Sequence, residues 1–194
     1  MNDSTDLNDL VYRSKEGRVT EQEISQVAGA LSSGDGGPDT YRLLYVIARC
    51  GARSHERLVA QFLSYRPDPA VAGLALQALC TFWGLTEKYL DEVERSLRGI
   101  EWDHNGDIRR IAITAAGEFL RTKPACSLLT ELLRLTDREI EEENVRRFAV
   151  EALARAIGKP LTEVLDPDTD GTDWGDWAIQ VIARARERFE TECA

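Results

Sequence analysis

A single apolar pattern recurs along the chain at a fixed interval, and it constrains the fold more than any other feature. Apolar residues at offsets 0, 3, 4, 7, 8 and 11 begin at Val71, at Ile108 and at Val145, each start lying 37 residues after the one before. These offsets place the side chains on one face of an α-helix over three turns. Such repetition is typical of stacked helical hairpins, in which each hairpin buries its apolar face against the next.

Weaker copies of the pattern flank the three clear ones, as is common for terminal repeats. They begin at Tyr41, where Arg49 interrupts the stripe, and at Trp174. Second helices are expected between the copies, over 55–65, 86–97, 124–135 and 160–165. No segment has the alternation of a strand. We therefore predict an all-α fold, an α-solenoid of about five helical hairpins.

The N-terminal region is expected to cap this stack. Thr20 and Glu23 have the spacing of a capping box, which opens an amphipathic helix. Residues 33–38 are rich in glycine and read as a flexible loop. We therefore assign 1–38 to N-terminal cap helices and this loop, and 39–194 to the solenoid, within one structural domain.

The charge of the chain bears on the class of its partner. The 34 acidic residues outnumber the 24 Lys and Arg, which gives a formal net charge of -10 and a pI of about 4.8. Such a surface repels phosphate backbones, which proteins bind with Lys and Arg. We expect a basic protein partner, no nucleic acid and no cofactor.

Hydropathy and cysteine spacing bear on the compartment. No apolar run approaches the ~18–20 residues of a membrane span, and residues 1–9 lack the basic start and apolar core of a signal peptide. We expect a cytoplasmic monomer with no membrane contact. The cysteines, Cys50, Cys80, Cys126 and Cys193, are widely spaced, and the first three lie in apolar helical stretches. We expect those three to be buried free thiols, without disulfides.

Two runs of the central copies resemble HEAT repeats. They are Asp107–Ala112 and Asn144–Ala149, each followed by alanine at offset 7, and the resemblance extends over roughly 39–194. It implies a HEAT-like solenoid, a fold that chiefly binds other proteins. It also implies a structural ladder between neighbouring repeats, formed by Asp107, Arg109, Asn144 and Arg146. Asp107 and Asn144 are in addition candidate N-caps of their helices.

The enzymatic branches of this family do not match the sequence. Deoxyhypusine hydroxylases carry repeated His-Glu pairs that hold iron, whereas this chain has one pair, His55-Glu56, and one further histidine, His104. HEAT-like DNA glycosylases use a basic groove, which conflicts with the net charge of -10. Phycobilin lyases share the fold, but no residue here indicates a bilin site. Two histidines also leave little acid–base chemistry at neutral pH, so we expect no enzyme.

The second helices supply the candidate binding residues, because in HEAT solenoids these helices line the concave face. Several carboxylates lie off the leucine stripes and are candidates to form a shallow acidic groove. They are Glu87, Asp91, Glu94, Glu131 and Glu163. Trp102, in an inter-repeat loop, is the best candidate for an exposed anchor. The alternatives are an ordinary solvated face for the carboxylates and burial for Trp102.

One segment has part of a metal-binding motif. Three alternating carboxylates match the start of an EF-hand calcium loop, with a glycine for the sharp turn. They are Asp166, Asp168 and Asp170, followed by Gly171. Trp177 stands where such a loop has its bidentate glutamate. The alternative is a polar loop that caps the following helix.

A further acidic run, Glu139–Glu143, precedes one of the repeat helices. Carboxylates there suit the helix dipole and solubility, and docking of a basic protein is the alternative. Taken together, the sequence favours a non-enzymatic protein-protein interaction module. Its most concrete form is an immunity or inhibitor protein that covers a basic toxin. The other hypotheses are a scaffold or adaptor, and a metal-binding or enzymatic protein that uses Asp166–Asp176.

Overall fold

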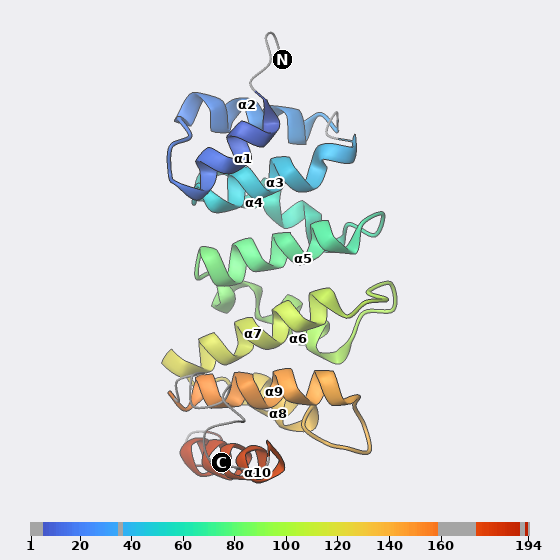
Figure 1. Cartoon of the computed structure of the whole chain (residues 1–194). Coiled ribbons are helices and arrows are strands. Elements are labelled where there is room, and N and C mark those ends of the chain that lie inside the picture. Colours follow the sequence, from blue (N-terminus) through green and yellow to red (C-terminus); the bar gives the residue numbers. More distant parts are fainter. Residues whose placement is uncertain (1–5, 35–36, 159–173, 191–192, 194) are drawn as a thin grey trace. The chain divides into compact units, whose positions relative to one another are not determined.

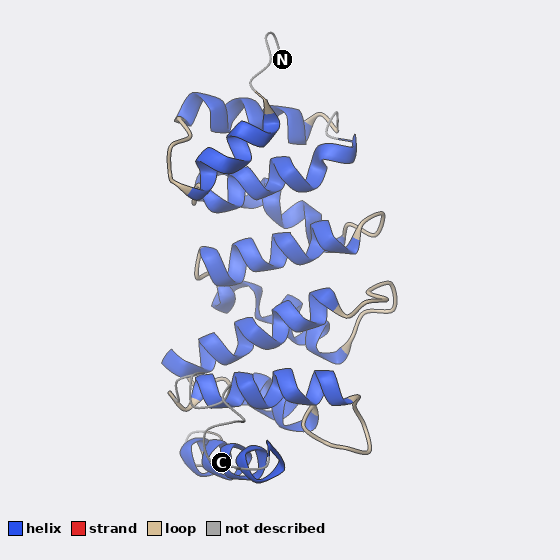
Figure 2. Cartoon of the chain, viewed as in Figure 1, coloured by secondary structure: helices blue, strands red, loops and turns tan. Residues whose placement is uncertain are grey.

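The computed structural model describes residues 6–34, 37–158, 174–190 and 193. Within these ranges the chain is helical and contains no strand, which confirms the all-α prediction (Figure 2). The chain divides into two compact units. Unit 1 comprises Met1–Leu85 with Trp102–Ile108, and unit 2 comprises Thr86–Glu101 with Arg109–Ala194. The division at residue 38 stays a prediction.

Unit 1 is organised around one central helix, α3. This helix packs against α1, α2 and α5, and its residues Leu44, Val46 and Ile47 are fully buried (Figure 1). Short 3-10 segments connect the α-helices of this unit. In chain order its elements are α1 (Leu7–Lys15), α2 (Glu21–Ser32), η1 (Gly37–Asp39), α3 (Thr40–Arg49), η2 (Arg53–His55), α4 (Glu56–Ala60), η3 (Gln61–Ser64), α5 (Pro69–Gln77) and η4 (Ala78–Phe82).

The capping box at the start of α2 is confirmed. The Thr20 side chain accepts the N–H of Glu23 at 3.3 Å, and the Glu23 carboxylate accepts the N–H of Thr20 at 2.9 Å. These bonds satisfy two of the N–H groups that a helix start leaves open. Glu23 also accepts a hydrogen bond from Arg13 at 2.6 Å. The same carboxylate therefore ties α1 to α2.

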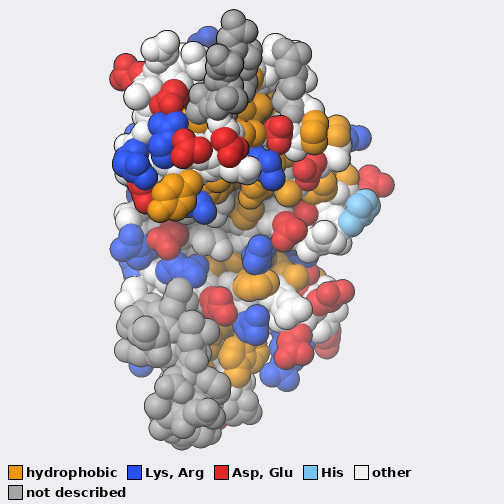
Figure 3. Space-filling view, turned by 45° about the horizontal axis from the view of Figure 1, so that its top comes forward, with side chains coloured by type: hydrophobic (Ala, Val, Ile, Leu, Met, Phe, Trp, Pro, Cys, Tyr) orange, Lys and Arg blue, Asp and Glu red, His pale blue; other side chains and the backbone are white. Residues whose placement is uncertain are grey.

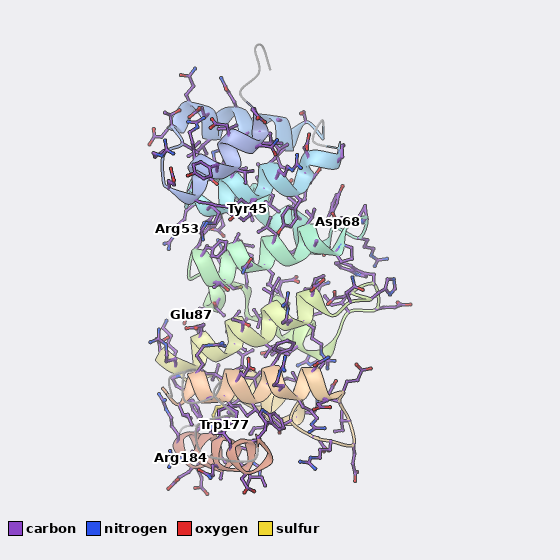
Figure 4. All side chains as sticks on the ribbon, viewed as in Figure 1. Tyr45, Arg53, Asp68, Glu87, Trp177 and Arg184 are labelled. Atoms are coloured by element: carbon purple, nitrogen blue, oxygen red, sulfur yellow. A yellow bond between two sulfur atoms is a disulfide. The ribbon has the colours of Figure 1, made fainter. Side chains whose placement is uncertain are left out.

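The end of α5 departs from regular α-helix. Its last turns form a π-helical segment, η4, and the chain then turns at Trp83, which is buried. The Trp83 indole N–H donates to the Ala48 carbonyl at 3.0 Å, and Arg53 donates to the Trp83 carbonyl (Figure 4). The π-helical segment η4 therefore ends at Trp83, which hydrogen bonds join to the end of α3 and to η2.

Unit 2 contains the three longest of the described helices, α7, α9 and α10, together with the shorter α6 and α8. Of its helices, α6 packs on α8, α8 on α9, and α9 on α10 (Figure 1). The first two residues of α7 are grouped with unit 1 and the rest with unit 2. Its elements are η5 (Thr86–Tyr89), α6 (Leu90–Arg98), α7 (Asp107–Thr122), α8 (Cys126–Arg134), α9 (Glu143–Ala156) and α10 (Trp174–Phe189).

The predicted apolar stripe forms the core. The residues at offsets 4, 7 and 8 are at most 1% exposed in all three central copies, which lie on α5 with η4, on α7 and on α9. They are Ala75, Ala78 and Leu79, then Ala112, Ala115 and Ala116, then Ala149, Ala152 and Leu153. Small side chains at these positions allow close helix packing. At one point a Cβ built on Gly117 of α7 would lie 2.7 Å from the Ala152 carbonyl oxygen of α9.

Of the two predicted N-caps of repeat helices, the one at Asn144 is wrong and the one at Asp107 stays a prediction. Asp107 is itself the first residue of α7. The N-cap of α9 is Glu142, which has extended backbone angles, so Asn144 already lies inside the helix. Stripe periodicity identifies the buried face of a helix, but it does not identify the residue at which the backbone first turns helical.

The prediction that Cys126 is a buried free thiol is wrong. Cys126 forms a disulfide with Cys193, 67 residues further along the chain. Cys126 is the first residue of α8. It is exposed because it lies at the N-terminal end of that helix and outside its buried stripe. Cys50 and Cys80 form no disulfide, the former being half-buried and the latter buried. Along the described parts of the chain, no helix combines the length and apolar character needed to cross a membrane.

Candidate functional site

The predicted acidic residues of the second helices lie in unit 2, apart from Glu163, which falls outside the described residues. Glu87 in η5 is exposed, and its carboxylate pairs with the Lys123 ammonium at 2.6 Å (Figure 4). Asp91 is exposed on the first turn of α6. The side chains of Glu94 and Glu131 are only 20% and 15% exposed. The last two are therefore poorly placed to meet a partner.

Arginine side chains connect Glu94 and Glu131. Arg98 donates to Glu94 at 3.3 Å and to Glu131 at 2.9 Å, which joins α6 to α8. Arg134 also donates to Glu131 at 2.9 Å. Burial alone would raise the pKa of Glu131, but the hydrogen bonds from Arg98 and Arg134 outweigh it and lower that pKa. The carboxylate is thus held ionised as part of an ion-pair network.

The network continues to the segment before α9. Arg134 reaches Glu141 at 3.2 Å, and Arg109 of α7 donates to both oxygens of Glu141, at 2.5 and 2.9 Å. Arg109 also donates to the Leu97 carbonyl at the end of α6, at 2.9 Å. Three glutamates are thereby matched by three arginines, so the formal charges of the network cancel. Its role is to fasten α6, α7 and α8 to the segment that leads into α9.

The two remaining sets of candidate residues lie elsewhere. Trp102 belongs to unit 1 and is half-buried beside Asp103, which is 9% exposed, so its ring is only partly available to a partner. Asp166, Asp168 and Asp170 lie outside the described residues. Within the described ranges, no three His, Cys, Asp or Glu side chains converge as a metal site requires.

The segment between α8 and α9 presents a feature that the sequence did not reveal. Ile140 is 53% exposed, and it is surrounded along the chain by exposed carboxylates. We call residues 137–143, which run up to the first residue of α9, the acidic loop. Its exposed acidic residues are Asp137, Glu139, Glu142 and Glu143, and Arg138 is its one basic residue. The run of carboxylates was visible in the sequence. The exposure of Ile140 was not, although its position outside every apolar stripe was a signal.

The acidic loop is held in place on both sides of Ile140. The Asp137 carboxylate accepts the N–H of Glu139 at 2.9 Å, and the Asp137 carbonyl accepts the N–H of Glu141 at 3.1 Å. The Glu141 side chain, 10% exposed, is bonded to Arg109 and Arg134. Ile140 therefore projects from a backbone fixed by its neighbours, because Glu141 points inward into the network.

Charges on the face drawn in Figure 3 are more evenly mixed, with acidic and basic side chains interspersed. Several exposed carboxylates are also paired locally, as Asp9 is with Arg13 and Glu92 with Arg95. The acidic loop, by contrast, carries four exposed carboxylates and one arginine within seven residues.

Comparisons of the chain with protein-family models, with curated proteins and with solved structures find no match.

Proposed function

We propose that this chain is a non-enzymatic protein-interaction module that binds a basic protein through the acidic loop. The observation that carries the proposal is Ile140, 53% exposed at the centre of a loop with four exposed carboxylates. An aliphatic side chain of this kind can fill an apolar pocket, and the carboxylates around it match a basic rim. The net charge of -10 would also speed the encounter with a basic partner.

The fixed backbone of the acidic loop lowers the conformational entropy that the loop would lose on binding. A flexible loop loses conformational entropy when it binds, which reduces its affinity. Here the bonds of Asp137 and the ion pairs of Glu141 already restrict the loop in the free protein. The loop therefore presents Ile140 at a smaller entropic cost than an unrestrained segment would.

The proposal has a more specific form and an alternative. Its most specific form is an immunity or inhibitor protein whose partner is a basic toxin, because the chain is small and acidic. The alternative is a scaffold or adaptor, which requires a second binding surface. Two exposed tyrosines of unit 1 favour it, since Tyr12 is 58% and Tyr41 is 41% exposed.

We further propose that the helices form a HEAT-like α-solenoid. The support is the recurrence of one buried stripe at a 37-residue interval on α5 with η4, on α7 and on α9, with the same three offsets buried each time. In such a stack the ion pairs of Arg109 would act as ties between neighbouring hairpins.

Affinity purification from the native source, with quantitative recovery, tests the binding proposal. The variants are Ile140→Ala and its matched control Ile179→Ala, since Ile179 of α10 is also exposed, at 64%. We expect wild type and the control to retain the same basic protein, and Ile140→Ala to lose about tenfold in affinity, as for an interface anchor. Equal retention of that protein by both variants would contradict the proposal.

A further inference from the structure

The bond between Cys126 and Cys193 joins the start of one helix to the end of another. Cys126 opens α8, and Cys193 lies one turn beyond α10, where its N–H donates to the Phe189 carbonyl at 2.9 Å. The Cα atoms of the two cysteines are 5.4 Å apart. Both α8 and α10 also pack on α9, so the disulfide closes a ring of three helices within unit 2.

A hollow lies between the two helices that this disulfide joins. Its volume is about 410 Å³. It is lined by Leu129 and Leu133 of α8, by Ala183, Arg186, Glu187 and Phe189 of α10, and by Glu190 just beyond that helix. Cys193 also lines it, so the disulfide lies at its edge. The disulfide links α8 to the chain just beyond α10 at the edge of this hollow, so it limits how far the two helices can separate there.

We infer that Cys126 and Cys193 form a reversible thiol–disulfide site, which a dithiol reductant opens and an oxidant closes. Cys126 is exposed and Cys193 partly exposed, so a reductant can reach the sulfur atoms. The buried Cys80 offers no such access. Exposed disulfides are the ones that tend to be labile and regulatory.

The position of Cys126 favours its departure as a thiolate. It is the first residue of α8, and Ala125 at the N-cap provides no side-chain hydrogen bond. The N–H groups at this helix start therefore stabilise negative charge on the Cys126 sulfur. A reductant thiolate should attack the Cys193 sulfur, because that leaves the charge on Cys126.

The exchange balances with one dithiol. Its first sulfur bonds to the Cys193 sulfur while the Cys126–Cys193 bond breaks, and the departing electron pair remains on Cys126, which then takes a proton. The second sulfur of the dithiol attacks the mixed disulfide and releases Cys193, which also takes a proton. The dithiol becomes a cyclic disulfide, and the protein gains two electrons and two protons.

Reduction should loosen the end of α10 without unfolding the unit. α10 keeps its packing on α9 through the buried residues Val181, Ala185 and Phe189. The Arg188 side chain also donates to the Ala156 carbonyl at 2.5 Å. Only the tie to α8 is lost, so the last turns of α10 can separate from α8 and expose the residues that line the hollow.

Limited trypsin digestion tests the inference, because α10 carries the exposed residues Arg184, Arg186 and Arg188. Before reduction we expect two thiols that react in denaturant, and four after dithiothreitol treatment under native conditions. Reduction should speed cleavage in α10 about tenfold, leave the helical circular dichroism unchanged, and be reversed by oxidised glutathione. With or without dithiothreitol, the Cys193→Ser variant should be cleaved as fast as the reduced wild-type protein. The Cys50→Ser variant should be cleaved as the wild type is under both conditions.

Each contrary outcome overturns the inference. A disulfide that resists dithiothreitol in the folded protein is structural and not a switch. Loss of the helical signal on reduction leads to the same conclusion. An unchanged cleavage rate shows that the bond does not restrain α10. If Cys193→Ser does not fold, the reduced wild-type protein still decides the question.

Discussion

The close approach of α7 to α9 at Gly117 provides a sharp test of the packing. A Cβ added to Gly117 would meet three atoms of Ala152, the carbonyl oxygen at 2.7 Å and Cα and Cβ at 2.9 Å each. Two of these atoms belong to the backbone, so no side-chain rotation relieves the contact. Gly117→Ala must therefore push α7 away from α9, where Ala116 and Leu153 are fully buried.

The magnitude follows from two opposing effects. Alanine is favoured over glycine inside a helix by about 1 kcal/mol, whereas overpacking a well-filled core costs about 1–3 kcal/mol. Because two of the three contacts are with backbone and all are shorter than 3.0 Å, we place the steric cost in the upper part of that range, about 2–3 kcal/mol, where it outweighs the gain. We expect a net loss of about 1–2 kcal/mol, or a fall in Tm of about 2–8 °C for a chain of this size.

Gly29 of α2 is the matched control. It lies in a helix and is exposed, and a Cβ built there meets nothing within 4 Å. Gly29→Ala should therefore stabilise the protein by about 0.5–1 kcal/mol. Urea denaturation with unchanged m-values compares the two variants. If Gly117→Ala stabilises the protein as Gly29→Ala does, α7 and α9 are not packed backbone to backbone.

Two further predictions concern the core and an ion pair. Ala112→Arg should abolish the cooperative melting transition followed by circular dichroism, because Ala112 is 0% exposed. Arg110 is exposed, so Arg110→Ala should lower the free energy of unfolding by less than about 1 kcal/mol. A normal melting transition for Ala112→Arg would contradict the assignment of the apolar stripe to the core. Hydrogen bonds from Arg13 and Thr20 lower the pKa of Glu23 from 4.5 to about 2, so its stabilising effect is complete above about pH 4.5 and is lost as the pH falls through about 2. Glu23→Gln should therefore unfold at a lower urea concentration than wild type at pH 7, and the two midpoints should converge near pH 2. A difference between the midpoints that does not change with pH would show that the charge of the Glu23 carboxylate does not stabilise the fold.

The sequence predicted the central repeat helices and their buried face because both depend on local spacing. The expected helix over 55–65 is instead divided into η2, α4 and η3, and the one expected over 160–165 lies outside the described residues. Offsets 4, 7 and 8 proved buried in every central copy, and the capping box of Thr20 formed as its spacing indicates. The N-cap at Asn144 was missed, since that boundary depends on backbone angles at Glu142 and not on the stripe.

The candidate site was less predictable because its contacts join residues far apart in the chain. Glu131 is neutralised by Arg98, 33 residues away, and Glu141 by Arg109, 32 residues away. Periodicity shows which carboxylates lie outside the apolar stripe, but it does not show which arginine of another helix pairs with each of them. The Cys126–Cys193 bond spans 67 residues and was missed for the same reason.

Titration calorimetry of the captured partner against two charge reversals tests the central claim most directly. Glu139→Lys changes the acidic loop, and Asp91→Lys changes an exposed carboxylate of α6. Binding through the loop predicts that Glu139→Lys weakens affinity at least about tenfold, while Asp91→Lys changes it less than about threefold. The opposite pattern, or equal affinity for both variants and wild type, would contradict binding of a basic partner at the acidic loop.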